Sequence, residues 1–182
     1  MKNEHAAGVL IFAGTFVFSI SMMIAEALYS GYSIHSNVIS DLGVGKTADI
    51  FNGTIIFLGI TLILGGVALL LPDRRKIFPY LLVIAGIGAM IVGLFPETTG
   101  APHTIGAFLV FLFSGIAALF GIKRFKSAFR YISPIVGIVV LVSIVLYAMS
   151  NYLRIGEGGM ERMIVYPALL WAIGLSVYLM SE

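Results

Sequence analysis

Residues 69–95 read LLLPDRRKIFPYLLVIAGIGAMIVGLF, and this stretch decides the class of protein. After a short basic segment, DRRK at 73–76, the chain runs uncharged and almost wholly apolar to residue 95. A bilayer core about 30 Å thick needs about 20 helical residues, whereas barrel strands alternate between apolar and polar positions over roughly ten residues. The uniform run therefore predicts a transmembrane helix and excludes a transmembrane β-barrel.

Composition extends this prediction to the whole chain. Of 182 residues, 59% are hydrophobic and 11% charged, with a mean hydropathy of +1.05. A soluble domain carries about a quarter charged residues, so we expect an all-α, polytopic membrane protein. The absence of cysteine excludes disulfides, thiolate metal sites and cysteine nucleophiles. A net charge of +2 without a basic stripe argues against nucleic acid as a partner.

Charged or Gly/Pro-rich connections separate the apolar blocks. We predict a compact six-helix bundle, with residues 1–182 as one transmembrane domain and helices at roughly 7–28, 51–71, 78–95, 105–122, 132–150 and 163–180. The first block is longer than a signal-peptide core, so we expect it to be retained. Pro79, Pro134 and Pro167 fall near predicted helix starts, where a missing N–H is tolerated. Small residues, as in AGIGAMIVG at 85–93, favour close helix packing in lipid.

The distribution of basic residues predicts the orientation. Six spans place both termini on one side of the membrane. If the N-terminus is inside, the inner segments hold 8 of the 11 basic residues, in Lys2, DRRK at 73–76 and KRFKSAFR at 123–130. An excess of lysine and arginine is typical of cytoplasmic loops. We therefore expect a multi-pass protein of the plasma membrane with both termini in the cytoplasm.

The outer side then receives a different population of residues. Six of the nine acids and two of the three histidines fall there. The polar outer residues are Glu26, His35, Asn37, Ser40, Asp41, Lys46, Asp49, Glu97, His103, Arg154, Glu157, Glu161 and Arg162. Because three loops of a small bundle must meet at its mouth, the sequence predicts a polar, titratable vestibule on the outer face.

Glu26 lies near the outer end of the first predicted helix. A carboxylate inside a membrane segment is costly and usually faces the bundle interior with a partner. Arg162, Arg154 and His35 are the candidate partners. Hydration at the depth of the lipid headgroups is the alternative.

Glu161 and Arg162 stand at the predicted start of the sixth helix. An acid in a first helical turn interacts favourably with the helix dipole, which gives Glu161 a structural explanation. Arg162 is either an anion clamp or a buried ion-pair partner, because guanidinium binds carboxylate and phosphate through two parallel hydrogen bonds. Tyr166 lies four positions further on, on the same helix face.

Two classes of function fit this vestibule. The leading hypothesis is binding of a lipid headgroup or another anionic or polar group, with Arg162 as anchor. Its further binding candidates are Glu26, His35, Asn37, Glu97 and Tyr166. The alternative is a membrane-embedded hydrolase or transferase in which Asp41 and His103 act as acid and base with support from Glu161.

We expect no cofactor, and membrane lipids as partners. A transition metal held by His35, His103 and a carboxylate is chemically reasonable, but no HxxxH or HExxH spacing places two histidines on one helix. A small transporter is less favoured, because no pair of broken helices or internal repeat is visible. A structural subunit, alone as a homo-oligomer or with a membrane partner, is the remaining alternative.

Four stretches resemble the archaeal branch of the membrane family called domain of unknown function 998. They are SNVISDLG at 36–43, FNGTIIFLG at 51–59, GLFPE at 93–97 with the following PH, and GGMERMIVYPALLW at 158–171. The resemblance covers about residues 8–180 and implies a six-helix membrane protein without assigning an activity. The matching positions are Asn37, Ser40, Asp41, Gly43, Asn52, Pro96, His103, Glu161 and Arg162.

Overall fold

The computed structural model describes residues 2–71, 77–126 and 128–181. In these ranges the chain forms six long helices and no strand. They are α1 (Lys2–Leu28), α2 (Ala48–Leu70), α3 (Ile77–Leu94), α4 (Ala101–Arg124), α5 (Phe129–Ala148) and α6 (Gly156–Ser181). Each is long and apolar enough to cross a membrane, which confirms the predicted helical class and the six spans. The basic segment at 73–76 lies outside the described residues.

The helix ends differ from the predicted ones, most of all in α6. This helix begins at Gly156 rather than near residue 163. The segment at its start is rich in glycine and charged residues, a composition typical of a loop. In the fold the buried charged side chains have partners, so this segment is helical. Pro167 consequently lies inside α6, not near its start as expected. Pro134 likewise lies inside α5, which begins at Phe129.

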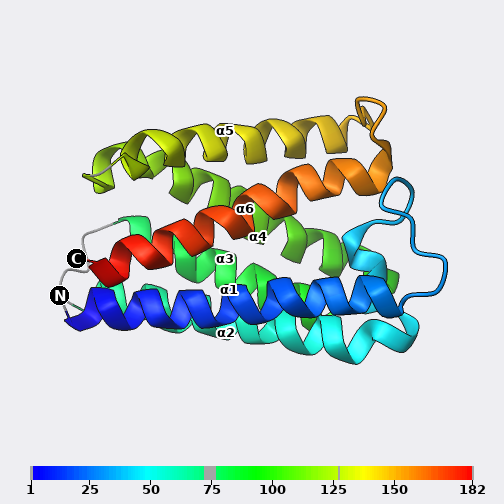
Figure 1. The fold of residues 1–182 in the computed structure, drawn as a ribbon, viewed down its shortest axis with the longest axis horizontal. Helices are drawn as coiled ribbons and strands as arrows, with labels where there is room; N and C mark the ends of the chain where they lie inside the picture. Colours follow the sequence, from blue (N-terminus) through cyan, green and yellow to red (C-terminus); the bar gives the residue numbers. More distant parts are fainter. Residues whose placement is uncertain (1, 72–76, 127, 182) are drawn as a thin grey trace.

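Consecutive helices pack against each other from α1 to α6, and α6 returns to α1 to close the bundle (Figure 1). α4 also contacts α6, which leaves α5 on the outside of the junction between them. Glycines let the backbones approach closely, as the small-residue pattern predicted. A Cβ atom on Gly59 of α2 would lie 2.7 Å from the carbonyl oxygen of Gly86 in α3, and the reverse distance is also 2.7 Å.

Both termini lie at one end of the bundle, while the connections from α1 to α2 and from α5 to α6 lie at the other (Figure 1). We call this second end the loop end. The first connection contains two 3-10 helices, η1 (Ile39–Gly43) and η2 (Gly45–Thr47), and the α3–α4 connection contains η3 (Glu97–Thr99). η1 contacts α1, α2, α6 and η3. It therefore closes the loop end of the bundle.

Two glycines at the start of α6 let the first connection lie directly on that helix. A Cβ atom on Gly158 would be 2.0 Å from the carbonyl oxygen of Asn37, and one on Gly156 would be 2.0 Å from that of His35. Gly156 also has a φ of 80°, which favours glycine. The Gly158 N–H donates to the His35 carbonyl at 3.2 Å. This close contact positions residues 34–41 over the end of the bundle.

Candidate functional site

Arg162 of α6 joins the first connection to α1. Its Nη2 donates to Glu26 Oε1 at 2.6 Å and to the Tyr32 hydroxyl at 2.7 Å. Its Nη1 donates to three backbone carbonyls, those of Ile34 (3.3 Å), Asn37 (3.1 Å) and Gly158 (2.8 Å). The Arg162 side chain is only 6% exposed and that of Glu26 18%. Of the three candidate partners for Glu26, the fold selects Arg162.

These contacts favour the ion-pair explanation of Arg162 over the anion clamp. Both terminal nitrogens are engaged, and Nε alone has no hydrogen-bond partner among the described residues. A bidentate grip on an anion would require the guanidinium to release Glu26 or its carbonyls. Tyr166 interacts with the same guanidinium, and the Tyr32 ring centroid lies 5.3 Å from its Cζ. Arg162 is therefore an internal link at the loop end.

Tyr32 completes this link. Its hydroxyl donates to the Val38 carbonyl at 3.0 Å while it accepts from Arg162. Burial raises the pKa of Tyr32, and the neighbouring carboxylate of Glu26 raises it further, although Arg162 acts in the opposite direction. The phenol therefore remains protonated and holds the turn before η1.

Glu161, the neighbour of Arg162, caps η1 instead of its own helix. Its Oε2 accepts the backbone N–H of Ile39, and its carboxylate also interacts with the N–H of Ser40. A 3-10 helix leaves its first N–H groups without internal partners, and the carboxylate supplies the acceptor. The expectation that Glu161 occupies the first turn of the sixth helix is wrong, because α6 begins five residues earlier, at Gly156.

A carboxyl pair lies beside this cap. Asn37 Nδ2 donates to Asp41 Oδ2 at 2.8 Å, and Glu97 of η3 interacts with the Ser40 hydroxyl and the Asp41 carboxyl. Burial raises the pKa of Glu97, and the charge of Asp41 raises it further, while Ser40 and His103 have the opposite effect. Glu97 thus binds a proton more tightly than a free glutamate does, and can share it with Asp41.

His103 is the third residue of α4, directly after Pro102 in the first turn. It is 8% exposed, and its Nδ1 lies 2.9 Å from the Phe95 carbonyl oxygen. A carbonyl can only accept, so Nδ1 carries the proton and donates. Nε2 is then the basic nitrogen of the neutral ring.

The structure thus brings together Asn37, Ser40, Asp41, Glu97, His103 and Glu161, which we call the acid cluster. His35 is exposed and contributes its backbone carbonyl, not its ring. Lys46, Asp49 and Arg154 are exposed as well, and Glu157 accepts from the Tyr147 hydroxyl at 3.0 Å. Within the described ranges no group of three or more His, Asp or Glu side chains is placed to hold a metal ion.

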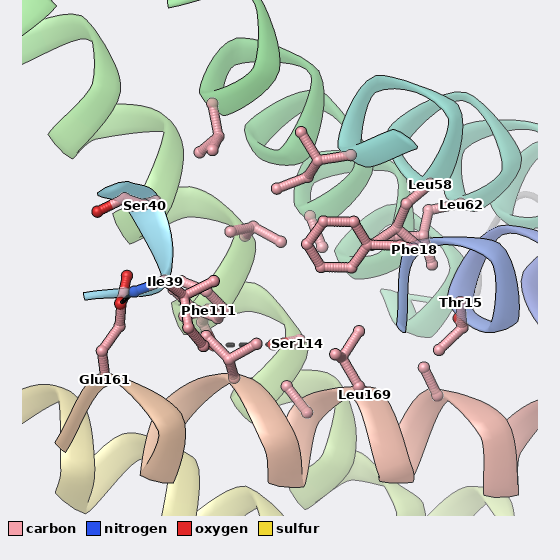
Figure 2. Close-up of a pocket in the computed structure, with 18 of the residues that line it drawn as sticks. Thr15, Phe18, Ile39, Ser40, Leu58, Leu62, Phe111, Ser114, Glu161 and Leu169 are labelled. Carbon is pink, nitrogen blue, oxygen red and sulfur yellow. Dashed lines mark hydrogen bonds between the residues drawn. The ribbon is translucent and has the colours of Figure 1, made fainter. Parts of the chain in front are cut away.

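A cavity of about 70 Å³ extends from the acid cluster into the bundle (Figure 2). Ser40, His103 and Glu161 line its polar end. Apolar side chains from α1, α2, α3, α4 and α6 form the walls, among them Phe18, Leu58, Phe111 and Leu169. Figure 2 shows Ser40 and Glu161 at one end and Thr15 at the other. The cavity surface is therefore almost wholly apolar, with Ser40, His103 and Glu161 at the loop end.

The positions of the lining residues give its length. The walls run from Glu161 to Ala172 on α6, from His103 to Ser114 on α4 and from Phe51 to Leu62 on α2. Each range spans eleven positions, or about 16 Å of helix. One water needs about 10–15 Å³ of such volume, so the cavity is long and narrow.

Sequence reasoning missed this cavity. Small residues face it, among them Ala85, Ala107, Ala168 and Ala172. In sequence such residues have the pattern of close helix packing. Only the side-chain positions distinguish an alanine against a neighbouring helix from an alanine against empty space.

The family described as "Protein of unknown function (DUF998)" matches residues 12–178. No curated protein and no solved structure matches the chain. The matched range contains the Glu26–Arg162 pair, the acid cluster and the cavity, together with nearly all of the six helices. The chain is therefore a multi-pass membrane protein, and it belongs to the DUF998 family.

Proposed function

We propose that this protein binds a single-chain amphiphile inside its helix bundle. The chain of the ligand occupies the apolar part of the cavity, and its head contacts Ser40, His103 and Glu161. The observation that carries this proposal is the cavity itself, an apolar space whose lining runs along about 16 Å of helix and includes Ser40, His103 and Glu161 at the loop end. Membrane lipids and their breakdown products have this chemistry.

The charges around the cavity favour a neutral or cationic head over the anionic one expected from sequence. Glu161 lines the polar end, and Asp41 and Glu97 lie behind it. Among the described lining residues there is no lysine or arginine, and Arg162 already binds Glu26. A phosphate would face carboxylates at short range, which is unfavourable in a poorly solvated site. A hydroxyl or amine head donates to them instead.

The single tryptophan of the chain provides a test. Trp171 lines the cavity and is 3% exposed. Titration of the detergent-purified protein with a long-chain alcohol brominated at its far end should quench this fluorescence in a saturable manner. The same alcohol with a phosphate head should quench weakly.

Variants on opposite faces of α4 control for non-specific quenching. Ala107 lines the cavity, whereas Ile105 is 58% exposed on the outside of the bundle. Ala107→Phe should weaken binding about tenfold or more, because overpacking costs about 1–3 kcal/mol. Ile105→Phe should bind as the wild type does. Equal, non-saturable quenching in all three proteins would overturn the proposal, provided that thermal unfolding shows Ala107→Phe to be folded.

A second candidate, a hydrolase or transferase acting on such an amphiphile, is favoured by one observation. His103 lines the loop end of the cavity, as Glu161 does, and its Nδ1 is held by the Phe95 carbonyl, which leaves Nε2 as the basic nitrogen. General acid–base catalysis requires such a group next to the reacting atoms. Asp41 and Glu97 would support proton transfer there.

Incubation of the purified protein with a long-chain acyl ester of glycerol separates the two candidates. An enzyme releases fatty acid, and His103→Gln should abolish the release while exposed His35→Gln retains it. A ligand recovered intact after long incubation supports binding alone. Zinc that is stoichiometric and removable by chelator would favour a metal-dependent reaction.

A further inference from the structure

The wall of the cavity is not equally buried on all sides. Every described lining residue from α1, η1, α2 and α3 is buried. Six lining residues are partly exposed, and all of them belong to α4 and α6: Ala107, Phe111, Ser114, Glu161, Ala168 and Leu169. The inner surface of a sealed cavity would be shared among all five helices of the wall. The exposure on two helices alone therefore indicates an opening between them.

The partly exposed residues follow one side of each helix. Residues three or four positions apart lie on the same helix face, and Ala107, Phe111 and Ser114 of α4 have this spacing. Glu161 and Ala168 of α6 are seven positions apart, which is about two helical turns. Because these residues also line the cavity, the opening is a slit along the two helices rather than a hole at the end of the bundle.

The neighbouring helix α5 leaves this slit uncovered. α4 and α6 cross each other instead of lying side by side (Figure 1), and the direct contact between them is small. α5 packs closely on the second half of α4, where Ser133 donates to the Ala118 carbonyl at 2.7 Å. A Cβ atom on Gly137 would lie 2.7 Å from the Gly115 carbonyl oxygen. The partly exposed residues of α4, at 107–114, precede these contacts, so the slit lies in the half of the bundle nearer the loop end.

The outer surface beside the slit is apolar. Ile105 and Phe108 of α4 are 58% and 52% exposed, and Leu170 of α6 is 69% exposed. Both helices are long and apolar enough to span the membrane, so lipid chains contact this surface. A hydrocarbon chain can then pass from the lipid into the apolar cavity without the free-energy cost of contact with water.

We infer that the cavity is open to the surrounding lipid between α4 and α6, and that its ligand enters sideways from the membrane. This inference rests on the proposed function and deepens it, because the ligand is then an amphiphile dissolved in the bilayer and not one taken up from water. Ser40, His103 and Glu161 lie at the loop end of the cavity, on the side of the membrane surface. The head of the ligand thus moves toward them while the molecule keeps the orientation that it has in the bilayer.

Labelling of single cysteines in the full-length protein in liposomes tests the opening, since the chain has no cysteine of its own. Ala168→Cys places a thiol in the slit, and Leu170→Cys places one on the lipid-facing surface. Ala89→Cys is the buried control, because Ala89 is 0% exposed and is not among the described lining residues. One probe is a maleimide with an alkyl chain, which dissolves in the bilayer, and the other is a charged maleimide, which stays in water. Thermal unfolding confirms that each variant is folded.

The alkyl maleimide should label Ala168→Cys at a rate within about tenfold of that of Leu170→Cys, because both thiols face the lipid. It should leave Ala89→Cys unlabelled, and the charged maleimide should label none of the three. Exposed Ser150→Cys at the loop end is the positive control for the charged probe. Labelling of Ala168→Cys by the charged probe would show a cavity open to water, and no labelling by either probe would show a closed cavity. Either result would overturn the inference.

Protection by dodecanol separates this inference from the proposed function. At ten times its Kd, the bound alcohol should slow labelling of Ala168→Cys about tenfold and leave Leu170→Cys unchanged. Labelling by the alkyl maleimide without protection would leave the opening but refute the proposed function, and with it a ligand that enters there. Saturable quenching of Trp171 together with labelling of Ala168→Cys by the charged probe would preserve amphiphile binding and overturn entry from the lipid.

Discussion

Arg162 and Glu26 form an ion pair across the junction of α6 and α1, with Nη2 and Oε1 2.6 Å apart. The same guanidinium binds the carbonyls of Ile34 and Asn37 in the first connection. One side chain thus fixes three segments, including the residues that lead into η1. The acid cluster and the mouth of the cavity are positioned by this connection.

Loss of one partner should therefore destabilise the protein strongly. Glu26→Gln leaves the buried guanidinium of Arg162 without its counter-charge. Breaking a fully buried ion pair costs about 3–5 kcal/mol of stability, and the cost is smaller here because Glu26 is partly exposed. Thermal unfolding in detergent measures the effect. The double variant Glu26→Gln/Arg162→Gln should lose less stability than the sum of the single variants. Exposed Glu157→Gln serves as the control, and additive losses would contradict a direct pair.

Stability should also depend on pH through Glu97. Its pKa is raised by burial and by Asp41, so the folded protein binds this proton more tightly than the unfolded chain. The stabilisation is fully present below the ordinary glutamate pKa of 4.5 and is lost as pH rises through the higher folded value. The unfolding temperature should therefore fall over this range. Glu97→Gln should flatten the change and exposed Asp49→Asn should not; an unaltered slope in Glu97→Gln would exclude this group.

Gly158 should tolerate no side chain. A Cβ atom there would lie 2.0 Å from the Asn37 carbonyl oxygen, so the first connection would have to move off α6. We expect Gly158→Ala to cost about 2 kcal/mol or more, since overpacking costs about 1–3 kcal/mol. Gly53→Ala is the control, because nothing beyond its chain neighbours and the backbone of its own helix lies within 4 Å of the added Cβ. A Gly158→Ala protein as stable as the control, measured by thermal unfolding, would show that this contact is adaptable.

The proposed orientation has its own test, because the chain contains no cysteine. Ser150→Cys places a single thiol at the loop end, and Ser181→Cys places one near the C-terminus; both positions are exposed. A membrane-impermeant maleimide should label Ser150→Cys in intact cells and Ser181→Cys only after permeabilisation. The reverse pattern would place the termini outside, against the distribution of lysine and arginine.

The amino-acid sequence by itself determined the helical class, the six spans and the tendency of the helices to pack through glycine. These follow from local physics, because lipid offers no hydrogen bonds and forces each apolar segment to satisfy its own backbone as a helix. The same argument required a partner for Glu26, and it limited that partner to three residues. Composition and periodicity are sufficient for such conclusions.

The tertiary structure alone decided what the polar residues do. Arg162 pairs with Glu26 instead of clamping an anion, and Glu161 caps η1 instead of its own helix. Both outcomes depend on contacts between segments more than a hundred positions apart. The cavity depends on the space that five helices leave between them. The volume of such a cavity depends on small differences in the sizes of many side chains and in the positions of their backbones. No local pattern in the sequence encodes it.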